Sequence, residues 1–323
     1  MTELTLDQWI GLRTGLGPSL CQETLNQWQR RRLQEQARYA IAHSRFWRQR
    51  YAGVDLERPE TWPLIDQTDL RSHGQDMLCL AQSQIQRIST LLTSGSCGQP
   101  KRLFFSQQDL EKTIDFFAYG MATLTDRGDR VWIGMNGPTP DSLGDLLARG
   151  LAAMGRKPIL HGECTDLDAD AAALRRDGPH CLVGIPQQVL ALARRLPELR
   201  PKTVLLSADN VPDPLRKEIG MLWQTQVYAH WGMRETGLGG AVECAAHQGY
   251  HIRHADLFLE IIHPSNGQVL PPGCRGELVI STLNRQAMPL LRYRTGDLAH
   301  LLDGPCPCGS TLLRLGYVEG HKS

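Results

Sequence analysis

A stretch of small hydroxyl and glycine residues followed by two cations, TSGSCGQPKR, occupies positions 93–102. Its glycines, Gly95 and Gly98, permit backbone angles that larger residues resist. A run of exposed N–H groups, with hydroxyls and a cation such as Lys101, is what a polyphosphate needs. A flexible hairpin turn has the same composition. The stretch alone therefore leaves phosphate binding and an ordinary turn open.

Two later stretches could complete a nucleotide site. HWGMRETG, residues 230–237, places an aromatic residue and a glycine close to Glu235, and YRTGD, residues 293–297, ends in Asp297. A glutamate oxygen suits a hard cation such as Mg²⁺, although capping a helix is a plainer role for the same residue. An Asp after Gly is also a common turn former. A phosphate turn, an aromatic-Gly-x-x-Glu segment and a late acidic residue can surround one nucleotide.

Nine cysteines are present, and a single residue separates Cys306 from Cys308. The segment ECAAHQGYHIRH adds four candidate metal ligands just before a strand-rich region: Cys244, His247, His251 and His254. One cysteine and one histidine of this segment, with Cys306 and Cys308, make four N/S ligands, the set of a closed structural Zn²⁺ site. Such an ion would not act in the chemistry, because four protein ligands leave no open position. Reduced, buried thiols are the alternative.

The bulk composition is that of an ordinary globular protein. The 323 residues are 41% hydrophobic and 21% charged, and 35 Lys and Arg against 34 Asp and Glu give a net charge of +1. This balance argues against nucleic acid or an anionic membrane as the main partner. No apolar run approaches the roughly 20 residues of a membrane helix, and the start, MTELTLDQWIGL, lacks the features of a signal peptide. We therefore expect a cytoplasmic protein.

The hydrophobic pattern predicts the elements that must position these residues. Between residues 131 and 231, short apolar runs alternate with helical patterns, which indicates an α/β fold with a doubly wound, mainly parallel sheet. Ligands bind such sheets at the carboxyl ends of the strands, where NGPTP, HGEC, PQQ, SADN and WGMRETG fall. One long helix is expected over 19–51. The expected division is an N-terminal helical segment (1–62), an α/β nucleotide-binding core (63–240) and a small β-rich subdomain (241–318).

The three nucleotide motifs, in this order and at these distances, resemble those of the adenylate-forming enzymes. Residues 276–320 are similar to the phenylacetate-CoA ligase group, and the resemblance covers roughly residues 20–321. It implies that a carboxylate attacks the α-phosphate of ATP to give an acyl-adenylate, and that a thiol, often coenzyme A, then takes the acyl group. The catalytic residues that it implies are Glu235, Lys101 and Arg234, with Glu235 holding Mg²⁺.

The resemblance also implies which residues meet the nucleotide. The turn at 93–98 would hold the β- and γ-phosphates, Trp231 would replace a tyrosine that stacks on adenine, and Asp297 would accept the ribose hydroxyls. The full set of implied cofactor-binding residues is Thr93, Ser94, Gly95, Ser96, Cys97, Gly98, Ser207, Ala208, Asp209, His230, Trp231, Gly232, Met233 and Asp297. The surroundings of one histidine look like the family's ligand stretch, so the expected zinc ligands are Cys244, His251, Cys306 and Cys308, with His247 in reserve.

Three departures from the family pattern are visible. Relatives carry Thr at the positions of Ser96 and Cys97. They carry Thr or Ser at the position of Arg234, whose guanidinium could bind phosphate bidentately or point into solvent. Relatives also continue into a C-terminal lid with a catalytic lysine, whereas residues 319–323 here resemble only a hinge remnant, with His321 in place of an arginine. We therefore expect a truncated product, a separate lid partner or a reduced enzyme, and the uncovered sheet surface favours a homodimer.

The expected function is ATP-dependent activation of a small-molecule carboxylic acid, followed by formation of a CoA thioester. Two alternatives stay open: an adenylyltransferase that leaves AMP on its acceptor, and a nucleotide-binding protein without turnover, which Arg234 and the missing lysine favour. The sequence does not identify the acid. Its pocket is expected near Phe116, Phe117 and residues 135–140, MNGPTP, where core packing is the plainer role of the two aromatic residues.

Overall fold

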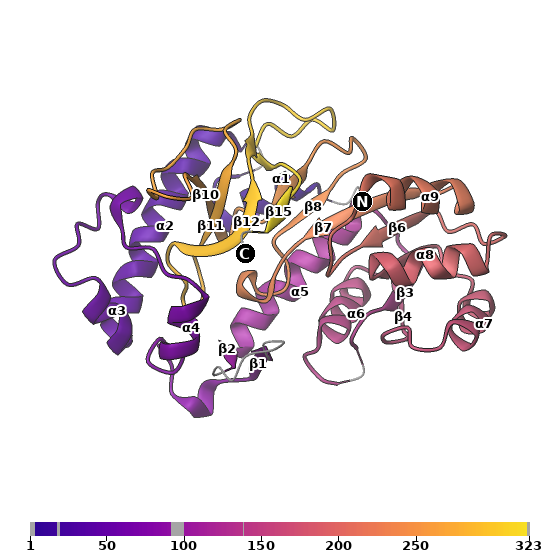
Figure 1. The fold of residues 1–323 in the computed structure, drawn as a ribbon, viewed down its shortest axis with the longest axis horizontal. Coiled ribbons are helices and arrows are strands. Elements are labelled where there is room, and N and C mark those ends of the chain that lie inside the picture. Colours follow the sequence, from indigo (N-terminus) through magenta and orange to yellow (C-terminus); the bar gives the residue numbers. More distant parts are fainter. Residues whose placement is uncertain (1–3, 18–19, 92–99, 138, 322–323) are drawn as a thin grey trace. The chain divides into compact units, whose positions relative to one another are not determined.

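The computed structural model describes residues 4–17, 20–91, 100–137 and 139–321. The phosphate turn expected at residues 93–98 lies outside these ranges. The chain forms two compact units, traced in Figure 1. Unit 1 takes residues 1–6, 112–233 and 238–251, and unit 2 takes residues 7–111, 234–237 and 252–323. The domain limits expected from the sequence stay a prediction, because compactness alone does not show which segments fold independently.

Unit 1 is built on a mainly parallel sheet, which confirms the predicted fold class. In the described part of the chain, parallel strands lie in the order β4-β3-β5-β6-β7, and β8 continues the sheet antiparallel to β7. The strands are β3 (Arg130–Gly134), β4 (Lys157–Leu160), β5 (Cys181–Gly184), β6 (Thr203–Leu206), β7 (Gln226–Trp231) and β8 (Ala241–Glu243). The helices between the parallel strands are α6 (Leu143–Ala153), α7 (Leu167–Asp177), α8 (Pro186–Arg195) and α9 (Asp213–Trp223).

Local signals start and end these helices. The Asp166 side chain accepts hydrogen bonds from the first backbone N–H groups of α7, and Gly178 ends that helix with a left-handed φ of 49°. Ser142 caps α6 in the same way, and Pro186 opens α8. Because each helix crosses back over the sheet, the carboxyl ends of the parallel strands gather at one edge.

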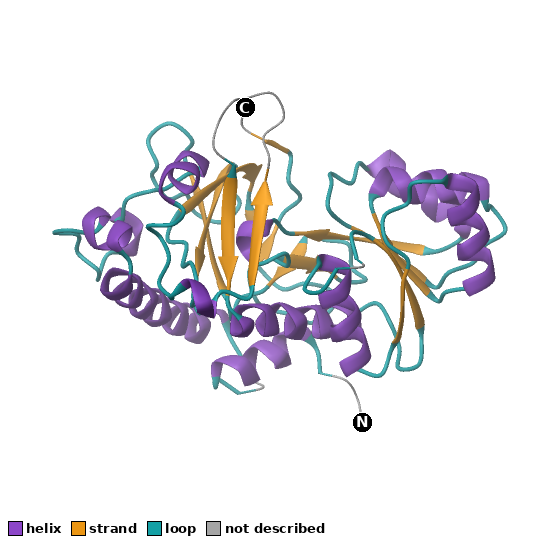
Figure 2. Ribbon diagram, turned by 90° about the horizontal axis from the view of Figure 1, so that it is seen from below, coloured by secondary structure: helices purple, strands orange, loops and turns teal. Residues whose placement is uncertain are grey.

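The sheet of unit 1 has helices on both faces (Figure 2). Leu182 and Val204 belong to a buried cluster with Leu192 of α8 and Trp223 of α9. The residues next along the strands, Val183 and Leu205, point to the opposite face, since side chains alternate along a strand. There they line a pocket with side chains of α5 (Gln107–Ala122) and α6. The same two strands therefore build the core on one face and a pocket on the other.

Unit 2 contains an antiparallel sheet in the order β10-β11-β12-β15 and a separate hairpin of β1 and β2. The strands are β1 (Arg87–Leu91), β2 (Lys101–Phe105), β10 (Leu257–Ile262), β11 (Gly276–Thr282), β12 (Tyr293–Ala299) and β15 (Gly320–His321); shorter ones are β13 (Leu301–Leu302) and β14 (Arg314–Leu315). The short strand β9 (Tyr250–Ile252) begins in unit 1, which ends at residue 251. The N-terminal helices are α1 (Leu6–Thr14), α2 (Gln22–His43), α3 (Arg45–Arg50) and α4 (Gln67–His73). No helix in the described ranges is both long and apolar enough to cross a membrane.

The single helix expected over 19–51 is wrong in one respect, because the chain breaks between α2 and α3. Ser44 has an extended backbone at the break, and its hydroxyl accepts a hydrogen bond from the backbone N–H of Trp47. The same hydroxyl donates to the carbonyl oxygen of Asp76 at 2.7 Å. A serine that satisfies both a new helix start and a distant carbonyl ends one helix and begins another.

Two buried glutamines attach α2 to the rest of unit 2. Gln29 Nε2 donates to the carbonyl oxygens of His254 and Leu257, at 2.8 and 3.0 Å. Gln36 Nε2 donates to the carbonyl oxygen of Arg285 at 2.9 Å. Because buried polar groups are costly unless they are hydrogen-bonded, these contacts favour one placement of the helix along the chain segments that it covers.

Gly150 of α6 should not tolerate a side chain, because α6 packs directly on the backbone of α5. A Cβ at Gly150 would lie 2.8 Å from the Ile114 carbonyl oxygen and 3.1 Å from the Ala118 nitrogen. We expect Gly150→Ala to lower the free energy of unfolding by about 1–3 kcal/mol in urea titrations. Gly220→Ala in α9 is the matched control, since its Cβ would come no closer than 3.4 Å to the Thr225 carbonyl oxygen. Equal losses at both positions would contradict the interpretation.

Candidate active site

Glu235 lies in a short 3-10 helix, η3 (Arg234–Thr236), and is only 1% exposed. Its carboxylate forms an ion pair with Lys101 of β2. Oε1 of Glu235 also accepts a hydrogen bond from the hydroxyl of Tyr293 in β12, at 3.2 Å. The backbone carbonyl of Glu235 accepts a hydrogen bond from Nη1 of Arg285, at 2.7 Å. The structure thus brings two of the expected catalytic residues together and adds two partners that the sequence did not predict.

Burial sets the electrostatics around Glu235. It lowers the pKa of the Arg285 guanidinium to about 10, although the negative charge of Asp109 acts in the opposite direction. Burial, followed by the charge of Glu235, raises the pKa of the Tyr293 hydroxyl well above its usual value. At neutral pH, Arg285 is therefore still charged and Tyr293 is still a hydrogen-bond donor. The buried carboxylate has an ammonium group and a phenol as direct partners, which is the pairing that a buried charge requires.

Arg234 has a different environment from its neighbour Glu235. It is exposed, and its Nη1 donates to the carbonyl oxygen of Thr90 at 2.9 Å and lies 3.4 Å from the hydroxyl of Ser89. Both partners belong to β1, the strand that leads toward the expected phosphate turn. The guanidinium is therefore attached to β1 instead of pointing freely into solvent, and its contact with phosphate stays a prediction.

Asp297 lies in β12 opposite His321 of β15, and Nδ1 of His321 is 3.2 Å from Oδ1 of Asp297. The neighbouring Gly296 has a φ of 83°, and a Cβ there would lie 2.5 Å from the imidazole of His321. Glycine is therefore required for the ring to lie where it does. The Asp297 side chain is 19% exposed. Its role in binding ribose stays a prediction.

The other expected nucleotide residues belong to unit 1 and lie at the ends of β6 and β7. Ser207 follows β6 directly, and its Oγ is 3.0 Å from Nδ1 of His230 in β7. Trp231 is buried, and a Cβ at Gly240 would lie 2.5 Å from its indole ring. The same strand leads on to Gly232 and Met233, and after Ser207 come two exposed residues, Ala208 and Asp209. The expected contacts of these residues with adenine stay predictions.

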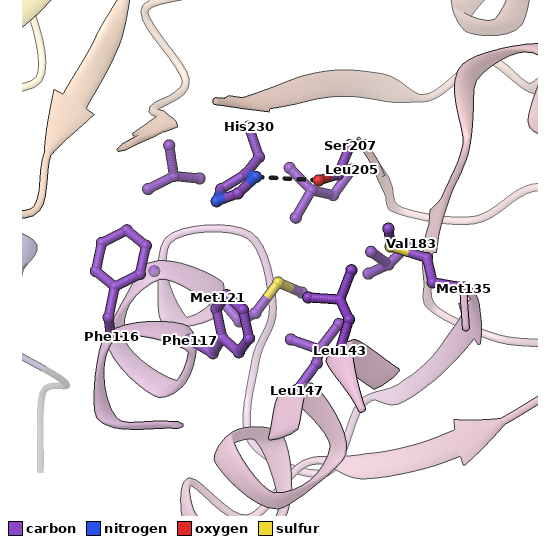
Figure 3. A pocket seen from close by; sticks show the side chains of 12 residues that line it. Phe116, Phe117, Met121, Met135, Leu143, Leu147, Val183, Leu205, Ser207 and His230 are labelled. Carbon is purple, nitrogen blue, oxygen red and sulfur yellow. Dashed lines mark hydrogen bonds between the residues drawn. The ribbon is translucent and has the colours of Figure 1, made fainter. Parts of the chain in front are cut away.

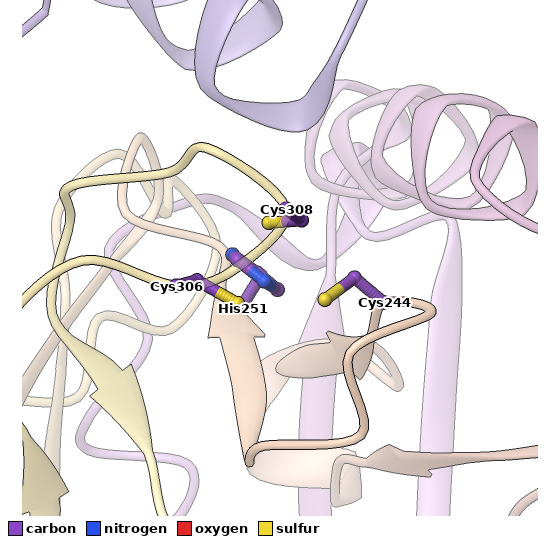
Figure 4. Close-up of side chains that lie close together, drawn as sticks. All are labelled: Cys244, His251, Cys306 and Cys308. Atoms are coloured by element: carbon purple, nitrogen blue, oxygen red, sulfur yellow. The ribbon is translucent and has the colours of Figure 1, made fainter.

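Figure 4 draws the four expected zinc ligands. Cys244 and His251 belong to unit 1, and Cys306 and Cys308 belong to unit 2. The reserve candidate, His247, lies beside Glu243, with 3.5 Å between Nδ1 and Oε2. Three sulfur donors and one imidazole nitrogen fit a tetrahedral structural Zn²⁺ site.

Tyr293 and Arg285 are the functional candidates that the sequence analysis missed. Tyr293 stands within the YRTGD motif, so its position could have indicated a role. Arg285 stands in LNRQAM, which carries no recognisable signal. Only the tertiary structure shows that both side chains reach Glu235.

No protein-family model matches the chain. The chain is 28% identical over 322 residues to a phenylacetate-coenzyme A ligase of Thermus thermophilus, a match that spans 94% of this chain and 72% of the relative. A phenylacetate-coenzyme A ligase of Pseudomonas putida is 26% identical over 320 residues, with 93% and 71% covered. A solved 2-hydroxyisobutyryl-CoA ligase, in the postadenylation state, superimposes with a TM-score of 0.81 at 22% identity, over 91% of this chain and 67% of that one. The last likeness bears on the fold alone.

Removing Lys101 should leave the buried Glu235 carboxylate without its countercharge. We expect Lys101→Met to lower the free energy of unfolding by about 3–5 kcal/mol, and a further Glu235→Gln change to recover part of that loss. Urea unfolding measures the loss in the single variant and the recovery in the double variant. Arg38→Met is the control, because its ion pair with Glu57 is more than half exposed and is worth about 1 kcal/mol at most. A loss at Lys101 no larger than at Arg38 would contradict the inferred strength of the pair.

Proposed function

Because this chain belongs to the adenylate-forming acyl-CoA ligase superfamily and has phenylacetate-CoA ligases among its homologues, we propose that it joins a carboxylic acid to coenzyme A with ATP as the energy source. In the first step, a carboxylate oxygen bonds to the α-phosphorus of ATP, and the bond to pyrophosphate breaks. In the second step, the thiol of coenzyme A loses its proton, its sulfur bonds to the acyl carbon, and AMP leaves. The buried pair of Glu235 and Lys101 is the observation that supports the proposal most strongly.

Glu235 is the proposed ligand of Mg²⁺, a hard cation that prefers carboxylate oxygen and neutralises phosphate charge. Lys101 is the proposed partner of a phosphate oxygen, since its ammonium group has three donors. Tyr293 and Arg285 are positioning residues, because one holds Oε1 of Glu235 and the other holds its backbone carbonyl. Groups that are fixed before the substrate binds stabilise developing charge without reorganising, which is the main electrostatic contribution to catalysis of this kind.

The remaining contacts with ATP are proposed from the same motifs. Residues 93–98 would hold the β- and γ-phosphates, Trp231 would lie against the adenine, and Asp297 would accept the ribose hydroxyls. Two observations bear on them. Asp297 is already within reach of a second polar side chain, His321, at 3.2 Å. Arg234 is attached to β1, which precedes the expected phosphate segment in the chain.

We also propose a structural zinc ion bound by Cys244, His251, Cys306 and Cys308. Their chemistry, three thiols and one imidazole, supports the site, as does the burial of the first three residues. A turn with two backbone hydrogen bonds presents the two cysteines nearest the C-terminus: Cys306 N–H to the Ser310 carbonyl at 2.7 Å, and Gly309 N–H to the Cys306 carbonyl at 2.8 Å. The zinc would hold its ligands in place and take no part in acyl transfer, because the set offers no open position.

Glu235→Gln should reduce ATP–pyrophosphate exchange, tested with a panel of carboxylic acids, by about 100-fold or more. The amide is nearly isosteric and still accepts a hydrogen bond from Tyr293, but it lacks the charge that a cation needs. Asp303→Asn, an exposed acid outside the site, serves as the control and should exchange at the wild-type rate. Consumption of coenzyme A would distinguish a ligase from an adenylyltransferase. Wild-type protein that binds ATP but supports no exchange with any acid would contradict the proposal.

The purified protein should contain about one equivalent of zinc per chain. Cys306→Ser should lose that metal and lower the melting temperature, because the three remaining ligands would bind the ion more weakly. Cys274→Ser is the matched control, since Cys274 is an exposed free thiol. Elemental analysis measures the metal and calorimetric melting measures stability. A metal-free wild type, or equal zinc in both variants, would show that the four residues are not a zinc site.

A further inference from the structure

A small apolar cavity lies within unit 1, between the sheet and helices α5 and α6 (Figure 3). Its volume is about 30 Å³, room for about two water molecules. The apolar lining includes Phe116, Phe117, Met121, Leu147, Val183 and Leu205. Methionine side chains adapt readily to the shape of what they contact. The lining therefore suits a compact hydrocarbon group and disfavours a charged one.

Two polar side chains interrupt this lining, Ser207 and His230. Figure 3 shows them next to each other, on the side of the cavity opposite Leu143 and Leu147. Ser207 Oγ lies 3.0 Å from Nδ1 of His230. The second ring nitrogen, Nε2, is buried and has no hydrogen-bond partner among the residues that the structure describes. Burial lowers the pKa of His230 to about 4, so the ring is neutral at neutral pH.

The backbone around His230 leaves little freedom to the ring. A Cβ at Gly232 would lie 2.7 Å from Cε1 of His230, and a Cβ at Gly239 would lie 2.7 Å from the ring of Phe116. Both glycines allow the chain to pass close to the walls of the cavity. A buried nitrogen that is held in place without a partner costs free energy, and a hydrogen-bonding group bound next to it would remove that cost.

We propose that this cavity receives the acyl group of the acid substrate and that His230 selects an acid carrying a hydroxyl group. The proposal rests on the proposed function and names the substrate class: compact, apolar hydroxy acids. The tautomer of His230 does not affect the choice. If Ser207 donates to Nδ1, then Nε2–H needs an acceptor; if Nδ1–H donates to Ser207, then Nε2 needs a donor. A hydroxyl group can donate a hydrogen bond and can also accept one, so it satisfies Nε2 in either tautomer. An ordered water molecule on Nε2 is the competing explanation, and it predicts no preference for hydroxylated acids.

Two matched acid pairs that differ by one hydroxyl test the proposal: isobutyric and 2-hydroxyisobutyric acid, and butyric and 3-hydroxybutyric acid. The kcat/KM of ATP–pyrophosphate exchange is measured for each acid, and calorimetry measures its direct binding. We expect at least one hydroxylated acid to be favoured over its partner by about 10- to 100-fold, because the unhydroxylated acid leaves the nitrogen unpaired.

Variants of His230 distinguish a role in selecting hydroxylated acids from a role in keeping the protein folded. His230→Leu should bring the preference ratio close to one, whereas His230→Gln, which keeps a polar group, should retain part of it. Met221→Leu, at an exposed residue outside the cavity, should leave the ratio unchanged. A general defect would slow both acids of a pair equally and would not move the ratio. Circular dichroism confirms that each variant is folded.

The outcomes distinguish this inference from the proposed function. Exchange without any preference for a hydroxylated acid, or a preference that survives His230→Leu, overturns the inference and leaves the ligase function standing. No exchange with any acid contradicts the ligase function, and calorimetry then decides the inference. A hydroxyl preference in binding that His230→Leu abolishes would support it, and binding without preference, or no binding, would overturn it.

Discussion

The buried carboxylate of Glu235 is the constraint on which the rest of unit 2 depends. A negative charge that is 1% exposed is tolerable only if its countercharge and hydrogen bonds are in place. Lys101 and Tyr293 supply them from β2 and β12. Arg285, which holds the backbone of Glu235, is itself held through its carbonyl by Gln36 of α2. Hydrogen bonds thus connect helix α2 to Glu235 through Arg285.

In unit 1, two neighbouring strands contribute to the core on one face of the sheet and to the cavity on the other. Leu182 and Val204 face the core with α8 and α9, and their neighbours Val183 and Leu205 face the cavity. A one-residue change of register would exchange the two sets of side chains. The parallel pairing of β5 with β6, Leu182 to Val204 and Val183 to Leu205, keeps each residue on its face.

The sequence predicted the features that depend on local pattern. It did not predict the helix boundary and the side-chain contacts that depend on residues far apart in the chain. The alternation of apolar runs and helical patterns over 131–231 was enough to predict the parallel sheet. The break at Ser44 was missed because it depends on the carbonyl of Asp76, more than 30 residues away. The contact between Arg285 and Glu235 spans 50 residues and leaves no local trace. The hydrogen bond between Arg234 and the Thr90 carbonyl oxygen of β1 likewise depends on the tertiary structure.

The discontinuity of unit 2 has a consequence for how the chain reaches its native state during synthesis. Helix α2 leaves the ribosome early, but the segments that accept its glutamine hydrogen bonds begin at His254. Residues 112–251, which form most of unit 1, are translated in between. At roughly 5–20 residues per second, that interval lasts about 7 to 28 s. For that time, the side of α2 that carries Gln29 waits for the segments that cover it in the native structure.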